Sequence, residues 1–152
     1  MGGYIRHVEK TIAIGSDHAG FELKKRVKER LNEIGWRCTD FGTNGLESMD
    51  YPDPAHAVAH AVESGEVLLG VLICGSGNGV SMAANRHKKV RCALAWAPEV
   101  AALGRKHNDA NILALPARFV STDQALAILD AFIAAEFEGG RHQRRVEKIE
   151  GC

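Results

Sequence analysis

The sequence has no long apolar run and no excess of either charge, and each absence excludes a class of protein. Among its 152 residues, 19 Lys and Arg balance 19 Asp and Glu, so no net charge favours nucleic acid or a membrane surface. The most basic segment, KKRVKER at residues 24–30, is interspersed with glutamates and predicts a solvated helix face. No apolar stretch approaches the roughly 20 residues of a membrane-spanning helix, and MGGYIRHVEK at the start lacks the apolar segment of a signal peptide. We therefore expect a cytoplasmic protein without membrane or nucleic-acid partners.

Cysteine is scarce and scattered. The four cysteines, Cys38, Cys74, Cys92 and Cys152, form no CxxC pair and no cluster with histidine. This spacing favours free thiols in a reducing compartment over a disulfide framework or a zinc site. The length fits one domain, and the sequence contains no repeat or low-complexity segment.

Short apolar runs alternate along the chain with segments of helical periodicity. The expected strands cover residues 11–15, 36–41, 67–74, 91–95 and 111–115. The expected helices cover residues 23–34, 54–64, 78–86, 97–107, 122–136 and about 140–149. Apolar strands that alternate with helices are typical of a parallel sheet with helices on both faces. We therefore predict an α/β fold, a single-domain, Rossmann-like three-layer αβα sandwich with a five-stranded parallel sheet. This domain would cover residues 11–152 and follow an N-terminal extension over residues 1–10.

Two glycine-containing loops follow expected strands, GSDHAG at residues 15–20 and CGSGNG at residues 74–79. In doubly wound sheets, ligands bind outside the carboxyl ends of the strands, where these loops lie. Neither loop has the glycine, lysine or serine positions of a dinucleotide fingerprint, a P-loop or a hydrolase elbow. The sequence therefore predicts a ligand site at these loops that follows none of these common motifs.

The second loop combines a thiol, Cys74, with a hydroxyl, Ser76, and with glycines that let a ligand approach closely. Backbone N–H groups at the start of the following helix attract negative charge. Cys74 is therefore a candidate thiolate base. The alternative is a buried core cysteine beside a tight turn.

Other candidate residues lie at strand and helix ends, where each also has a structural explanation. His18 follows Asp17 at the end of the first expected strand, and Asp17 is equally suited to cap the next helix. His107 ends an expected helix, where the helix dipole stabilises a surface imidazolium. Arg141 and Arg145 share one face of the last expected helix, where two guanidinium groups can bind a phosphate. The alternative for this pair is a solvated basic helix end.

His56 and His60 share a helix face at the i, i+4 spacing of HAVAH, a spacing that can hold a metal ion. The general-base glutamate of HExxH is missing, and no third ligand is indicated. We therefore expect no metal at this pair, and a metal hydrolase that uses both histidines is the alternative.

Five stretches of the sequence resemble, in order and spacing, the type B ribose-5-phosphate isomerases, a family grouped with the galactose-6-phosphate isomerase subunits. The stretches are GSDHAGFELK (15–24), DYPDPA (50–55), GVLICGSGNGVSMAANR (70–86), RKHNDANILAL (105–115) and FEGGRHQRRV (137–146). The resemblance begins near residue 11 and reaches the C-terminus. It implies a metal-free and cofactor-free isomerase that interconverts ribose 5-phosphate and ribulose 5-phosphate through a cis-enediolate.

The resemblance also implies a role for each candidate residue. Cys74 is the implied base that moves a proton between C2 and C1, and Ser76 with the N–H groups of residues 75–79 forms the implied anion hole. His107 would help to open the furanose ring, with Asp17 assisting. The other implied contacts are phosphate anchors (His18, Arg118, Arg141 and Arg145), sugar contacts (Tyr51 and Asn108), the loop residues Gly75, Gly77, Asn78 and Gly79, and a supporting residue, Asn85.

The family pattern further implies a homodimer, or a tetramer of two such dimers, whose sites lie between subunits, with His107 and the arginines from the partner chain. One branch of the family lacks the cysteine and uses a glutamate where this chain has Val80, so the thiol present here is consistent with a cysteine base. GSGNG and ALAW are nevertheless closer to that branch. The substrate therefore stays open between ribose 5-phosphate and allose 6-phosphate, galactose 6-phosphate or a tetrose phosphate. A non-catalytic sugar-phosphate sensor is the other alternative.

Overall fold

The core of the protein is a five-stranded sheet in which every pair of neighbours is parallel. The structure, a computed structural model, describes residues 9–151, so residues 1–8 of the expected N-terminal extension and Cys152 lie outside the described residues. The strands are β1 (Thr11–Ser16), β2 (Arg37–Asp40), β3 (Leu69–Cys74), β4 (Cys92–Leu94) and β5 (Ile112–Pro116). They lie in the order β2-β1-β3-β5-β4. The predicted number and parallel direction of the strands are confirmed.

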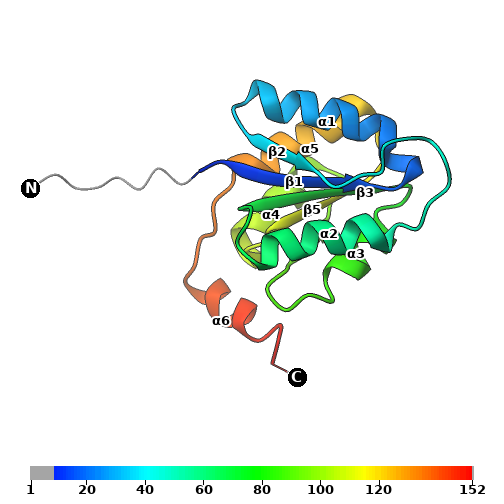
Figure 1. Cartoon of the computed structure of the whole chain (residues 1–152). Helices are drawn as coiled ribbons and strands as arrows, with labels where there is room; N and C mark the ends of the chain where they lie inside the picture. The colour runs from blue at the N-terminus through cyan, green and yellow to red at the C-terminus, as the bar shows by residue number, and fades with distance from the viewer. Residues whose placement is uncertain (1–8, 152) are drawn as a thin grey trace, which may run out of the picture.

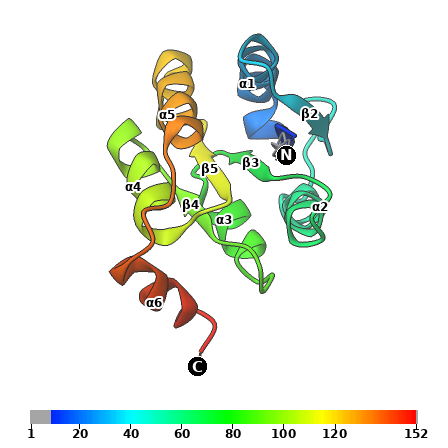
Figure 2. The ribbon, with the colours of Figure 1, turned by 90° about the vertical axis from the view of Figure 1, so that its left-hand side faces the viewer.

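Helices cover both faces of this sheet, which makes three layers (Figures 1 and 2). The helices are a 3-10 turn η1 (His18–Gly20), α1 (Phe21–Glu33), α2 (Pro52–Glu63), α3 (Asn78–Ala84), α4 (Pro98–Asn108), α5 (Thr122–Ala134) and α6 (Arg141–Glu147). Side chains of α1, α4 and α5 share one buried cluster with Ile12 and Ile14 of β1. Side chains of α2 and α3 share the other buried cluster with Ala13, the β1 residue between Ile12 and Ile14 in the sequence. Because successive residues of a strand face opposite sides, this alternation confirms the predicted αβα sandwich.

Local signals account for the end of α1 and the start of α5. Gly35, at φ +85, follows α1 and adopts a backbone conformation that favours glycine. The hydroxyl of Ser121 accepts the N–H of Gln124, whose side chain in turn accepts the N–H of Ser121, and this capping box begins α5. The helix expected over about 140–149 is shorter, Arg141–Glu147. The helix expected over 78–86 ends at Ala84, within the one or two residues by which helix ends usually vary.

Figure 1 shows β1 and β3 running side by side in the same direction, with α6 near the end of the sheet where these strands begin. The glycine loops after β1 and β3 therefore lie at the opposite, carboxyl edge. Among the described residues, no helix combines the length and apolar character needed to cross a bilayer.

Candidate active site

A pocket of about 310 Å³ opens where β1, β3 and β5 end. Its lining residues are Asp17, Tyr51, Cys74, Gly75, Ser76, Gly79, Arg118 and Phe119. All of these except Phe119 are candidates from the sequence. They come from four separate segments of the chain, and the parallel sheet brings them together because its carboxyl edge gathers the loops of neighbouring strands.

Cys74 is the last residue of β3 and is 5% exposed at the base of the pocket. The N–H of Gly77 donates a hydrogen bond to its Sγ atom over 3.2 Å. Gly77 has φ +77, and a Cβ atom there would lie 2.4 Å from Cδ1 of Leu94. Only glycine fits this turn without strain. The turn starts α3 and aims a backbone donor at the sulfur, where it can stabilise negative charge.

Ser76 and Tyr51 form the wall of the pocket beside this turn. The hydroxyl oxygen of Ser76 accepts the N–H of Asn78 over 3.3 Å, and its own proton remains free to donate to a ligand. The ring of Tyr51 lies directly on the backbone of Gly79. It is so close that a Cβ atom at Gly79 would be 2.6 Å from the ring carbons. The absent side chain at Gly79 therefore makes room for the tyrosine.

Asp17 both caps a helix and lines the pocket, so the two interpretations made from the sequence are compatible. Its Oδ1 atom accepts the N–H of Gly20 over 3.1 Å, and its own N–H donates to the carbonyl oxygen of Ile73 over 3.2 Å. The neighbouring His18 accepts the N–H of Met49 at Nδ1 over 3.3 Å. His18 therefore ties the loop before α2 to the edge of the pocket.

Arg118 supplies a positive charge at the pocket. Its backbone N–H donates to the carbonyl oxygen of Gly75 over 3.0 Å, so the turn after β5 is held against the loop after β3. The guanidinium group lies over Gly75, where a Cβ atom would meet it at 3.3 Å. The next residue, Phe119, lines the pocket although 75% of it is exposed. No motif or periodicity in the sequence had indicated Phe119.

A buried lysine fixes the loop between β2 and α2, which carries Tyr51. Lys24 is 1% exposed, although the sequence indicated a solvated face for its helix segment, and that prediction is wrong at this position. Its Nζ atom donates to Oδ1 of Asp40 over 2.7 Å and to the carbonyl oxygen of Thr43 over 2.5 Å. Burial alone would raise the pKa of Asp40, but hydrogen bonds from Lys24 and Lys28 outweigh it and leave this pKa below its ordinary value.

The other predicted site residues do not line this pocket. His107 and Asn108 end α4, Asn85 follows α3, and Arg141 and Arg145 lie on α6. Figure 1 shows α6 below the sheet, on the side where β1 and β3 begin and away from the loops that follow these strands. Asn85 and Asn108 instead line a second pocket of about 330 Å³. Within one chain, the predicted site is therefore divided between two ends of the sheet.

His107 is part of a small cluster at this second end. Its ring stacks on that of His142 at a centroid distance of 4.1 Å and an angle of 10°. Its Nε2 atom lies 3.5 Å from Oε1 of Glu138. Burial, followed by the charges of His107 and Arg141, lowers the pKa of His142. The three side chains could each offer a metal-ligating atom, but near-parallel rings do not direct their lone pairs at a common point.

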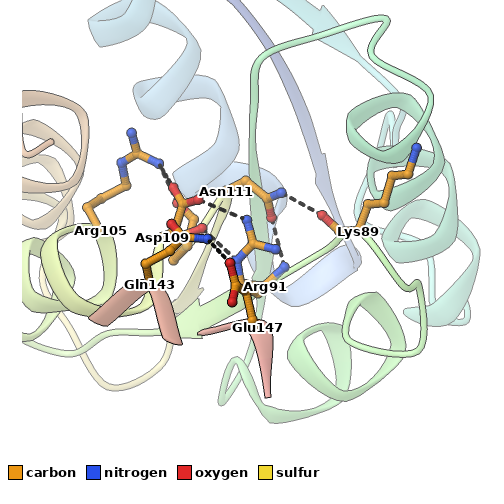
Figure 3. Close-up of polar contacts among 8 residues, drawn as sticks. Lys89, Arg91, Arg105, Asp109, Asn111, Gln143 and Glu147 are labelled. Atoms are coloured by element: carbon orange, nitrogen blue, oxygen red, sulfur yellow. Dashed lines mark hydrogen bonds and ion pairs between the residues drawn. The ribbon is translucent and has the colours of Figure 1, made fainter. Parts of the chain in front are cut away.

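A polar network holds the end of α4 that carries His107 (Figure 3). Asp109 ends the helix in a left-handed conformation, φ 48. The Nε atom of Arg91 donates to the carbonyl oxygen of Asp109 over 2.8 Å, and the backbone N–H of Arg91 donates to Oδ1 of Asn111 over 2.8 Å. Arg105 lies on the other side of the same aspartate, 3.9 Å from its Oδ1. The position of His107 is therefore set by a turn that these hydrogen bonds hold.

Known proteins match this chain along nearly its whole length. The profile of the ribose/galactose isomerase family matches residues 12–149. Ribose-5-phosphate isomerase B of Escherichia coli (strain K12) is 48% identical over 140 residues, which cover 92% of this chain and 94% of that protein. The solved structure of ribose-5-phosphate isomerase B from Clostridium thermocellum has a TM-score of 0.92 at 50% identity, over 93% of this chain and 95% of its own.

A second solved structure carries a ligand. The ribose-5-phosphate isomerase B of Mycoplasma genitalium, with bound ribulose-5-phosphate, has a TM-score of 0.90 at 46% identity, over 93% of this chain and 94% of its own. The resemblance carried by the five sequence stretches is thereby confirmed. The chain belongs to the ribose/galactose isomerase family and is a sugar-phosphate isomerase.

Proposed function

We propose that this protein interconverts ribose 5-phosphate and ribulose 5-phosphate, with Cys74 as the base. The observation that carries the proposal is the position of the Cys74 thiol, which lies in the pocket with a backbone N–H on its sulfur and a guanidinium group on the same wall. The names of the E. coli and C. thermocellum relatives, and the ribulose-5-phosphate bound to the M. genitalium protein, support this choice of substrate.

The chemistry requires a proton to move between two neighbouring carbons. The thiolate of Cys74 takes the proton from C2 of the open-chain aldose, and the electron pair of that C–H bond forms a C1–C2 double bond while negative charge moves to O1. The N–H groups of residues 75–79 and the hydroxyl of Ser76 stabilise the resulting cis-enediolate. Transfer of a proton from O2 to O1 and return of the first proton to C1 give the ketose. No electrons leave the substrate, so the proposed reaction needs no redox cofactor.

We also propose that two chains assemble into a dimer whose sites lie between subunits. His107, Arg141 and Arg145 cannot reach the Cys74 pocket of their own chain, because they lie at the other end of the sheet. A second copy could bring the same groups to that pocket. Large apolar side chains are exposed at Met82 and Trp96, as Phe119 is, and such surface is commonly buried by a partner.

The test is the rate of ribose 5-phosphate isomerisation by chelator-treated protein in deuterated water. We expect turnover by the natural sequence, with some solvent deuterium in the product. The Cys74→Ala variant should lose roughly 10²- to 10⁴-fold in kcat, which is typical for removal of a general base. Turnover that survives this substitution would overturn the role of Cys74. Turnover of only a hexose or tetrose phosphate would overturn the proposed substrate, and ligand binding without any proton exchange would indicate a sensor.

A further inference from the structure

The loop between β2 and α2 has no regular structure, yet it leads directly to Tyr51 of the pocket. Residues 41–50 form neither helix nor strand, and most of residues 44–50 are exposed. A segment of this kind keeps one position only where contacts with the rest of the fold hold it. The contacts that hold residues 41–50 therefore decide where Tyr51 lies.

The start of this loop is bonded to the strand that leads into the pocket. The backbone N–H of Ser16 donates to the carbonyl oxygen of Gly42 over 2.7 Å, and the N–H of Thr43 donates to the carbonyl oxygen of Ser16 over 2.7 Å. Ser16 is the last residue of β1, and Asp17 of the pocket follows it. A shift of residues 42 and 43 would therefore move the backbone beside Asp17.

Lys24 holds the same two loop residues from the other side. Its Nζ atom donates to the carbonyl oxygen of Thr43 over 2.5 Å and to Oδ1 of Asp40 over 2.7 Å. The same carboxylate oxygen accepts the N–H of Gly42 over 2.8 Å. The side chain of Lys24 is 1% exposed, so bulk water does not replace it as a partner of this carbonyl group.

A second contact holds the far end of the loop to the same part of the chain. The N–H of Met49 donates to Nδ1 of His18 over 3.3 Å. His18 begins the 3-10 turn that leads into α1, the helix of Lys24. Both ends of the loop are thus tied to one continuous segment, residues 16–24. Tyr51 follows two residues after Met49.

We propose that Lys24 is a positioning residue of the isomerase, which sets the loop before Tyr51 and the backbone beside Asp17 through its contacts with Asp40 and Thr43. Lys24 does not line the pocket, so it acts through these residues and does not touch the substrate. The inference rests on the proposed function, which requires the sugar phosphate to bind in the pocket that Asp17 and Tyr51 line.

The base of the proposed reaction is held independently of this loop. Cys74 ends β3, and its hydrogen-bond donor Gly77 belongs to the turn that follows. Loss of the Lys24 contacts should therefore disturb the binding wall of the pocket more than the proton transfer. A residue that only stabilises the fold would not separate these two effects.

Lys28 provides a matched control on the same helix. Its Nζ atom donates to Oδ2 of Asp40 over 2.9 Å, and its side chain is 40% exposed. Within residues 9–151, it has no hydrogen bond to the loop over residues 41–50. Removing the Lys28 charge therefore takes a cation from Asp40 but leaves the contact between Lys24 and Thr43 in place.

The experiment compares Lys24→Met with Lys28→Met by steady-state kinetics with ribose 5-phosphate and by amide hydrogen exchange, at a temperature where both variants are folded. We expect Lys24→Met to lower kcat/KM roughly 10- to 100-fold, the scale of a small displacement of groups that bind substrate, mainly through a higher KM. The N–H groups of Thr43 and Met49 should also exchange faster. Lys28→Met should leave KM and the exchange of the loop unchanged.

A natural KM and natural loop exchange in Lys24→Met would overturn the proposal, as would a fall in kcat at constant KM. Equal effects of Lys28→Met would show that the contact with Thr43 is not what matters, and would overturn it too. If Lys24→Met does not fold, Asp40→Asn, at a partly exposed position, should raise KM and speed exchange at Gly42, and no change in either would contradict the proposal.

Failure of the proposed function gives a different result. It would appear as an absence of ribose 5-phosphate turnover by the natural sequence. The exchange measurement needs no substrate, so it still decides whether Lys24 positions the loop. Unchanged exchange at Thr43 and Met49 in Lys24→Met would then reject the positioning role by itself.

Discussion

The backbone N–H of Gly77 donates directly to the thiol sulfur of Cys74, over 3.2 Å. This contact joins the last residue of β3 to the residue that precedes α3. It exists because Gly77 occupies a left-handed conformation that turns its N–H back toward the strand. The base of the proposed reaction and its first hydrogen-bond donor are thus parts of one four-residue turn, residues 74–77.

Gly77→Ala should damage both the fold and the reaction. The new methyl group would meet Leu94 at 2.4 Å in a backbone conformation that L-residues rarely adopt, and the left-handed conformation alone costs about 1–2 kcal/mol. We expect a lower free energy of unfolding in urea and a fall in kcat. Gly45→Ala is the control, since its Cβ would meet no atom within 4 Å, and it should change stability by less than about 0.5 kcal/mol. Equal effects of the two substitutions would contradict this account of the turn.

Arg118→Ala should weaken substrate binding more than it slows the chemical step. Its guanidinium group is the cation that lines the pocket, and loss of a hydrogen bond to a charged group typically costs about 1.5–3 kcal/mol. We therefore expect KM for the sugar phosphate to rise roughly 10- to 100-fold, with partial recovery in Arg118→Lys. Arg26→Ala, at an exposed ion pair on α1, is the control and should leave KM unchanged. A fall in kcat at constant KM would contradict a binding role.

The ion pair between the buried Lys24 and the partly buried Asp40 should make stability depend on pH. Folding lowers the pKa of Asp40, despite its burial, because Lys24 and Lys28 donate to it. The contribution of the Asp40 charge to the free energy of unfolding is therefore complete above the ordinary carboxyl pKa of about 4. It is lost as the pH falls through the lowered pKa of the folded state. Asp40→Asn should cost about 3 kcal/mol near pH 7, since it leaves the buried lysine without its charged partner.

Urea titrations at about pH 7 and about pH 3 test this expectation. The difference between the natural sequence and Asp40→Asn should shrink at the lower pH. Glu22→Gln removes an exposed pair with Lys25 and should change stability by less than about 0.5 kcal/mol at either pH. A penalty for Asp40→Asn that does not change with pH would show that Asp40 acts through its shape rather than its charge.

Cys38 and Cys92 should resist alkylation at neutral pH. Burial raises the pKa of Cys38 to about 11 and that of Cys92 to about 12. Because the thiolate is the reactive form, less than about one part in a thousand of either thiol is reactive near pH 7.5. Iodoacetamide labelling followed by peptide mapping should find both cysteines unmodified at that pH and Cys38 increasingly modified above about pH 10. Rapid labelling of either at neutral pH would be inconsistent with this burial.

Patterns along the sequence determined the parallel sheet, its helices and the loop chemistry at Cys74. They did so because apolar periodicity and glycine placement act over a few residues, and parallel strands place the loops that follow them at one edge. The same reasoning placed Lys24 in a solvated face, but its burial depends on Asp40 and Thr43, which lie beyond its own helix. A charged side chain can be buried when distant groups satisfy it, and local pattern does not contain those groups.

Tertiary structure alone decided which candidate residues meet. Asp17, Cys74 and Arg118 come together because β1, β3 and β5 are neighbours, an order that the sequence did not specify. His107 lies at the end of the sheet where the strands begin, because α4 runs back from the carboxyl end of β4 and His107 is near its last residue. Local periodicity determines what each segment becomes, whereas packing over the whole chain determines which segments touch.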